Sequence, residues 1–311
     1  MALTTNELFS RIKPSQIREF DELFRSVEDC IPMTIGEPDF DMPENVKQAA
    51  IKAIEDNASH YAHTSGEIGV RKAVSEFLEK QYDLHYDPET EIVMTVGATE
   101  GLFAAAFGLL NPGDQVIIPS PFFPLYSYAV ELNRGECILV DTSDTDFLMT
   151  PELLHKTMAE NKNVKAIFLN YPSNPTGATY TKEELTALAD AIKQYDIFVL
   201  SDEIYSEITY GEKHTSIATM LRDRTILFQG ASKAFAMTGW RVGVLAADAK
   251  WMKTLFLAHQ QLVTTGVTVS NRAAEEAFRN SAPDVEKMRS EYEKRRNILV
   301  PALQEAGFEV P

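Results

Sequence analysis

Lys233 is the side chain whose type and setting point most directly to chemistry. It follows an apolar run typical of a buried strand, Thr225–Phe228, and a hydroxyl residue, Ser232, precedes it. Burial disfavours the ammonium form of a lysine, and the neutral amine is the nucleophile that forms an imine. Arg241 lies eight residues further on and can hold a phosphate through two parallel hydrogen bonds. This pattern favours a Schiff base between Lys233 and a phosphorylated aldehyde.

A carboxylate and an amide follow two other apolar runs. Asp202 comes after Ile197–Leu200, and Asn174 comes after Ala166–Leu169 in a turn that is stiffened by prolines. An acid can keep a pyridinium nitrogen protonated, so that the ring withdraws electrons from a carbanion. An asparagine amide can donate to the phenolic oxygen of the same ring. Together with Lys233, these side chains predict a site for pyridoxal 5'-phosphate.

Small residues occupy the junction between a fourth apolar run, Ile92–Val96, and an alanine-rich helix. Gly97, Ala98 and Thr99 leave backbone N–H groups free for a phosphate at the helix N-terminus. Any one of these motifs alone is more often an ordinary turn, helix cap or core residue. Four of them in order, each at the end of a strand-like run, favour cofactor binding.

Strand-like and helix-like patterns alternate from about residue 91 to residue 247. This alternation predicts an α/β fold with a mainly parallel sheet and helices on both of its faces. Ligands of such sheets lie beyond the carboxyl ends of the strands, which is where the four segments fall. The expected strands are Ile92–Val96, Gln115–Pro119, Cys137–Val140, Ala166–Asn170, Ile197–Ser201, Ile226–Gln229 and Val242–Ala246.

Both flanks of this alternating region are predicted to be helical. An arm with a helical start precedes residue 44, and Asp41 and Pro43 fit an N-cap and a first-turn proline of the next helix. Two long helical stretches are expected after the last strand, at Ala249–Arg279 and Pro283–Glu305.

From about Ile35 to its last residue the chain resembles the class I/II aminotransferases of fold type I, the aspartate aminotransferase superfamily. Within it, Ser201–Tyr210 and Ser216–Thr219 are most similar to the branch of aromatic and N-acetyl-diaminopimelate aminotransferases. The resemblance implies a mainly parallel seven-stranded sheet and an incomplete small domain. It places an N-terminal arm with part of the small domain at 1–44, a large cofactor-binding domain at 45–285 and the start of a truncated C-terminal small domain at 286–311. The motifs that carry it are Gly36–Phe40, Asn174–Gly177, Ser201–Tyr205 and the segment around Lys233.

The resemblance also implies a role for individual residues. Lys233 is implied to be the Schiff-base lysine, and Asp202 the partner of the pyridine nitrogen. Tyr205, the third residue implied to be catalytic, and Asn174 would bind the phenolic oxygen. The remaining implied ligands are Phe123 stacked on the ring, Gly97, Ala98, Thr99, Ser232 and Arg241 around the phosphate, Tyr61 on the phosphate of the neighbouring subunit's cofactor, and Gly36 with Asn174 in the substrate pocket. Gly230 stands where many relatives carry a phosphate-binding serine.

The implied activity is a transaminase (EC 2.6.1.-) that moves an amino group from an L-amino acid to a 2-oxo acid, and the implied assembly is a homodimer. Two alternatives stay open: a carbon–sulfur lyase or decarboxylase of the same fold, and a truncated, catalytically impaired cofactor-binding protein. Relatives continue beyond Pro311 and carry there an arginine for the substrate's carboxylate, whereas this sequence has no arginine after Arg296. We therefore expect the chain as given to keep the cofactor site, to transaminate poorly and to expose apolar surface.

Composition excludes several other classes. The formal charge of −17 over 311 residues argues against nucleic acid and anionic membranes as partners. Cys30 and Cys137 give no disulfide framework and no metal motif, which predicts a cytoplasmic protein without a metal site. His60 and His63 are expected to be structural or to line the pocket. Neither a signal peptide nor an apolar run long enough to cross a membrane is expected.

Overall fold

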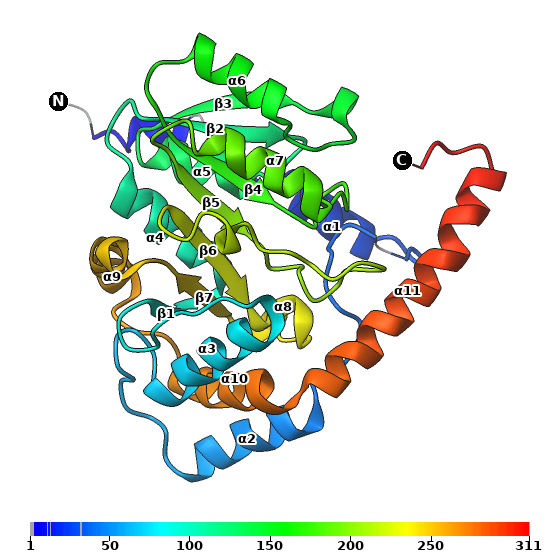
Figure 1. Ribbon diagram of the computed structural model, residues 1–311. Coiled ribbons are helices and arrows are strands. Elements are labelled where there is room, and N and C mark those ends of the chain that lie inside the picture. The colour runs from blue at the N-terminus through cyan, green and yellow to red at the C-terminus, as the bar shows by residue number, and fades with distance from the viewer. Residues whose placement is uncertain (1–2, 11, 13, 32, 311) are drawn as a thin grey trace. The chain divides into compact units, whose positions relative to one another are not determined.

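The computed structural model describes residues 3–10, 12, 14–31 and 33–310 (Figure 1). The chain forms two compact units that divide after Asp39. The smaller unit contains a 3-10 helix, η1 (Glu7–Ser10), and helix α1 (Gln16–Arg25), in accord with the expected helical start. Asp21 joins α1 to the following segment, because its carboxylate accepts from Arg25 and from the Thr34 hydroxyl, each at 2.8 Å. The predicted domain boundaries after residues 44 and 285 stay predictions.

Seven described strands of the larger unit form one mainly parallel sheet, as predicted (Figure 1). Their spatial order is β1-β7-β6-β5-β4-β2-β3, and only β7 runs antiparallel to its neighbours. Each expected strand is present within two residues of its predicted ends. The strands are β1 (Ile92–Val96), β2 (Gln115–Ser120), β3 (Glu136–Asp141), β4 (Val164–Asn170), β5 (Phe198–Asp202), β6 (Thr225–Gly230) and β7 (Val242–Ala246).

Helices cover both faces of the sheet, which follows from the alternation of side chains along each strand. In β7, Val244 packs with α3 and α10, whereas the next residue, Leu245, packs with α4 and α9 on the other face. A third cluster joins the first face of β4 and β5 to α6 and α7. The helices are α2 (Glu44–Glu55), α3 (Ile68–Tyr82), α4 (Gly97–Leu109), α5 (Leu125–Leu132), α6 (Pro151–Glu160), α7 (Lys182–Ile192), α8 (Ala231–Ala234), α9 (Ala249–Val263), α10 (Thr268–Asn280) and α11 (Ala282–Glu305), with 3-10 turns η2 (Ser143–Thr145), η3 (Ile217–Thr219) and η4 (Thr238–Trp240).

Two helix predictions are wrong in detail. Helix α2 begins at Glu44 with Pro43 as its N-cap, so Asp41 lies outside the helix instead of capping it. The stretch Ala249–Arg279 is two helices, α9 and α10, because the chain turns at Thr264, whose φ is +66°. The hydroxyls of Thr265 and Thr268 then donate to backbone carbonyls of residues 60–63, at 2.8–3.3 Å, and hold that loop against the junction.

Across the described part of the chain, every helix is too short or too polar to cross a membrane.

Candidate active site

Asp202 is the last residue of β5 and is almost completely buried, with 4% of its surface exposed. The Tyr126 hydroxyl of α5 donates to its Oδ2 at 2.8 Å, and the Ile204 backbone N–H donates to its Oδ1 at 3.2 Å. Burial raises the pKa of Asp202 to about 6, against these two hydrogen bonds, which lower it. The carboxylate is therefore placed where a cationic partner would stabilise its ionised form.

The raised pKa of Asp202 predicts a pH-dependent stability of the cofactor-free protein. A pKa that folding raises from 3.8 to about 6 means that the folded state holds this proton more tightly than the unfolded state. The contribution of Asp202 to stability is then fully present below pH 4 and is lost as pH rises through 6, by roughly 3 kcal/mol. Urea unfolding between pH 4 and 7 should show this loss in the parent protein and not in Asp202→Asn. Parallel profiles for the two proteins would refute the assignment.

Lys233, Tyr205 and Asn174 lie around the same strand ends. Lys233 is in α8, directly after β6, and its Nζ lies 5.6 Å from the centre of the Tyr205 ring. The Asn174 amide donates to the Tyr205 hydroxyl at 3.5 Å. Burial raises the pKa of Tyr205 to about 12, so this hydroxyl keeps its proton and can donate it. Asn170 links the end of β5 to the loop that carries Asn174. Its side-chain amide donates to the Asp202 carbonyl at 2.9 Å, and its side-chain oxygen accepts from the Asn174 backbone N–H at 2.7 Å.

The turn that opens α4 lies against Arg241. The Gly97 N–H donates to the Arg241 carbonyl at 3.0 Å, and Gly97 has a φ of +73°. A Cβ on Gly97 would come within 2.5 Å of the Arg241 guanidinium. Ala98 and Thr99 follow in the first turn of α4, so the backbone N–H groups of a helix start and a guanidinium share one place. This arrangement, called the anion cradle below, has the geometry to hold an anion such as a phosphate ester.

We expect Gly97→Ala to weaken cofactor binding about tenfold, because the new methyl group displaces the Arg241 guanidinium. Gly113→Ala is the matched control: Gly113 also has a positive φ, +85°, but nothing lies within 4 Å of the position of its Cβ. Equilibrium dialysis of pyridoxal phosphate would measure the dissociation constants. The two variants should lose similar stability from backbone strain, and a dissociation constant raised equally in both would contradict the cradle.

Ser232 and Phe123 lie next to residues described above. Ser232 precedes Lys233 in α8 and is buried. The Phe123 ring meets the Tyr126 ring edge-on, with centroids 5.8 Å apart, and Tyr126 in turn contacts Asp202. Tyr61 is 89% exposed, in the loop after α2. Gly36 belongs to the smaller unit, and its role in the substrate pocket stays a prediction.

The sequence analysis missed the role of Tyr126. The ring is 2% exposed, stacks on Phe168 with centroids 4.7 Å apart, and directs its hydroxyl at Asp202. Tyr126 thus orients the buried acid. A hydroxyl-bearing aromatic three residues after Phe123 was a signal that could have found it.

The two histidines singled out in the sequence lie in the loop that the α9–α10 junction holds. The Ser65 N–H donates to His63 Nδ1 at 3.2 Å, and the His60 carbonyl accepts from Thr268 at 2.8 Å. Among residues 3–10, 12, 14–31 and 33–310, no cluster of three or more His, Cys, Asp or Glu side chains could hold a metal ion.

The seven-stranded sheet with helices on both faces is that of a fold type I transferase of amino groups. The sequence matches the family model "Aminotransferase class I and II" over residues 28–311, and the chain belongs to this family. It is 42% identical to a probable N-acetyl-LL-diaminopimelate aminotransferase of Bacillus subtilis, over 96% of this chain and 76% of that protein. It is 37% identical to aromatic-amino-acid aminotransferase 2 of Thermococcus litoralis, over 98% of this chain and 80% of that protein.

A solved structure agrees with these relatives. The aspartate aminotransferase of Thermus thermophilus with maleate superimposes with a TM-score of 0.94 at 34% identity, over 99% of this chain and 82% of that one. The protein is an aminotransferase that uses pyridoxal phosphate and transfers an amino group from an amino acid to a 2-oxo acid. A lyase or decarboxylase activity is not favoured, since these relatives are aminotransferases.

Proposed function

We propose that Lys233, Asp202 and the side chains around them hold pyridoxal phosphate and carry the transamination. The observation that supports this most is the buried Asp202 carboxylate, which faces α5 at the end of β5 while Lys233 follows the next strand of the sheet, β6. When bound, the cofactor supplies an electron sink for the carbanion that forms at the substrate's α-carbon. Asp202 would hold its ring nitrogen, and the Tyr205 and Asn174 side chains would hold its phenolic oxygen.

The remaining ligands divide between the ring and the phosphate. Phe123, whose ring touches that of Tyr126, would stack on the cofactor ring. Lys233 Nζ would bind the aldehyde carbon and, once released, take the proton from the substrate's α-carbon as a general base. The phosphate would lie in the cradle formed by Gly97, Ala98, Thr99, Ser232 and Arg241.

The substrate class can be tested by half-reactions. The relatives named above are aminotransferases for N-acetyl-LL-diaminopimelate, aromatic amino acids and aspartate, and we propose that the amino donor belongs to one of these classes. Each donor would be mixed with the holoenzyme without an acceptor, and the spectrum of the bound cofactor followed. One class should convert the cofactor at least tenfold faster than the others. Absence of conversion with every donor would refute transamination by this chain.

We also propose that the enzyme is a homodimer in which Tyr61 reaches the partner's cofactor phosphate. Exposure of 89% of this aromatic side chain supports the proposal, since a large exposed ring often lies at an interface. Light scattering should give twice the chain mass of 34.8 kDa at micromolar concentration. Tyr61→Phe should raise the dissociation constant of the cofactor by about ten- to hundredfold, through the loss of a hydrogen bond to a charged group. A fully loaded monomer would contradict the proposal.

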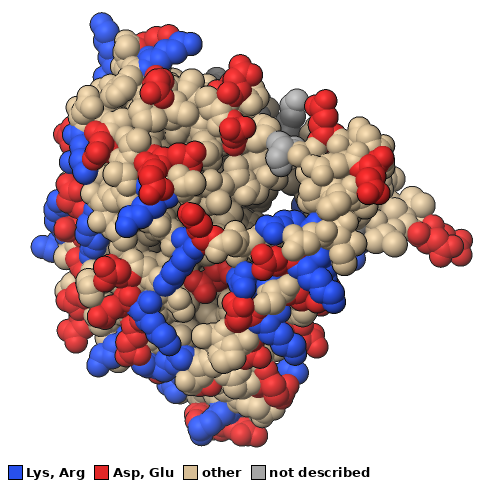
Figure 2. Space-filling model, turned by 45° about the vertical axis from the view of Figure 1, so that its right-hand side comes forward, with Lys and Arg blue, Asp and Glu red and all other residues tan. Residues whose placement is uncertain are grey.

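We propose that the protein acts on small-molecule substrates and that it is located in the cytoplasm. On the face drawn in Figure 2, basic side chains are interspersed with acidic ones instead of forming one positive surface. With the net charge of −17, this disfavours binding to nucleic acid. Cys30 and Cys137 are both free thiols, which supports a reducing compartment. Fractionation of cells that produce the protein should recover it with soluble cytoplasmic markers.

A further inference from the structure

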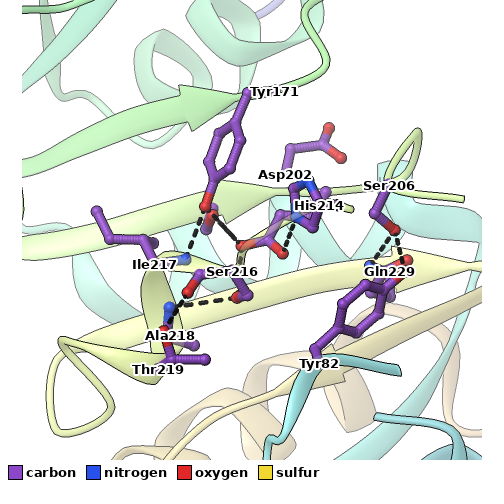
Figure 3. Close-up of polar contacts among 12 residues, drawn as sticks. Tyr82, Tyr171, Asp202, Ser206, His214, Ser216, Ile217, Ala218, Thr219 and Gln229 are labelled. Atoms are coloured by element: carbon purple, nitrogen blue, oxygen red, sulfur yellow. Dashed lines mark hydrogen bonds and ion pairs between the residues drawn. The ribbon is translucent and has the colours of Figure 1, made fainter. Parts of the chain in front are cut away.

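A second carboxylate, Glu203, follows Asp202 directly and points to the opposite face of β5. Successive side chains of a strand alternate between its faces, so Ser201 and Glu203 share one face and Asp202 lies on the other. Figure 3 shows the difference: dashed contacts converge from Tyr171, Ser216 and His214, and the Asp202 carboxylate points away from them. Glu203 is 0% exposed, so its charge is fully removed from water.

Three hydroxyl donors and the ring of His214 contact this buried carboxylate. Its Oε1 accepts from Ser201 at 2.7 Å, Ser216 at 2.8 Å and Tyr171 at 3.1 Å, and its Oε2 contacts His214 Nε2 at 2.8 Å. The Tyr171 and Ser216 hydroxyls accept from the backbone N–H groups of residues 217 and 218, at 2.7 and 3.2 Å, so their own protons are directed at Glu203.

These four side chains come from three separate parts of the chain. Tyr171 follows β4, Ser201 belongs to β5, and His214 and Ser216 lie in the loop before η3. The backbone of Glu203 adds a bond to β6, since its N–H donates to the Phe228 carbonyl at 3.0 Å, and its carbonyl accepts from the Ser206 N–H at 3.0 Å, which closes the turn that carries Tyr205. Glu203 thus joins both neighbouring strands at the point where Asp202 and Tyr205 leave the sheet.

We propose that Glu203 is a positioning residue. Its hydrogen bonds on the face of β5 that it shares with Ser201 hold Asp202, on the opposite face, in place for the pyridine nitrogen of the cofactor. The inference rests on the proposed role of Asp202. A second effect acts in the same direction. Burial is the main cause of the raised pKa of Asp202, and the negative charge of Glu203 adds to it, so Asp202 gains more from a cationic partner.

A double-mutant cycle tests the proposal, with the dissociation constant of pyridoxal phosphate as its readout. The four proteins are the parent, Glu203→Gln, Asp202→Asn and the double variant, each first shown to be folded by circular dichroism without cofactor. Glutamine keeps the shape of Glu203 but removes the carboxylate and replaces one acceptor oxygen by a donor group. We expect Glu203→Gln to raise the dissociation constant about tenfold in the parent and less than twofold in Asp202→Asn.

Glu207→Gln is the control, because Glu207 is a half-buried carboxylate of the same turn and is bound by the Tyr82 hydroxyl instead of the Glu203 cluster. It should change the dissociation constant less than twofold. If Glu203→Gln does not fold, Ser216→Ala removes one donor from the same carboxylate and should give a smaller loss, about threefold, that also disappears in Asp202→Asn.

The outcomes separate this inference from the proposed site. An equal effect of Glu203→Gln in both backgrounds, or of Glu207→Gln and Glu203→Gln in the parent, would overturn the positioning role. If Asp202→Asn raises the dissociation constant and neither Glu203→Gln nor Ser216→Ala does, the positioning role is overturned and the role of Asp202 stays intact. No effect of Asp202→Asn would refute the role of Asp202 and this inference with it.

Discussion

Lys233→Ala is expected to lower the rate of transamination by about 10⁴-fold at saturating cofactor. The variant loses both the nucleophile for the aldehyde and the general base for the substrate's α-proton. The fold should be unaffected, because Lys233 lies on the short helix α8 and its neighbours Ala231, Ser232 and Ala234 supply the buried side chains. Stopped-flow half-reactions would give the rate.

Borohydride reduction provides an independent test of the same lysine. In the parent, reduction should fix the cofactor irreversibly to the peptide that contains Lys233, and in Lys233→Ala it should fix none. Lys193→Ala is the control, since this lysine pairs only with Asp190 on the surface of the protein. A mass adduct on any lysine other than Lys233 in the parent would refute the assignment.

Asp202→Asn is expected to lower exchange of the substrate's α-proton by about 10²- to 10³-fold, even with cofactor at saturation. Asparagine keeps an acceptor for the Tyr126 hydroxyl but loses the negative charge, so the ring nitrogen is no longer held in its protonated form. Loss of deuterium from a substrate labelled at the α-carbon measures this step alone. Tyr126→Phe is a graded comparison, because it removes only the hydrogen bond that orients the acid, and a tenfold loss is expected. Near-normal exchange in Asp202→Asn would refute the role.

The strand ends could be predicted from the sequence because each is marked locally. Lys233, Asp202 and Asn174 follow apolar runs, and the neighbouring runs that place them in one sheet have the same composition. The contacts that orient these side chains carry no such mark. Tyr126 and Asp202 lie 76 positions apart and meet only because β2 and α5 lie beside β4 and β5. The break at Thr264 was missed for a similar reason. The junction between α9 and α10 is held by hydrogen bonds to residues 60–63, which lie far from it in the sequence, so the pattern of residues 249–279 alone does not reveal it.

The position of β7 has a consequence for the order in which the protein can be assembled during synthesis. Among the described strands β1 pairs with β7 alone, with Ile92 opposite Ala246. Strand β1 therefore has no partner strand until β7 has been synthesised. The Gly97 N–H likewise has no acceptor until Arg241 has been synthesised, because it donates to the Arg241 carbonyl. Such distant pairing is slow to form, and a ribosome-bound chain that ends before about residue 246 cannot complete it. The arrangement of Gly97 against Arg241, proposed above to hold the cofactor phosphate, can therefore form only after β7 has left the ribosome.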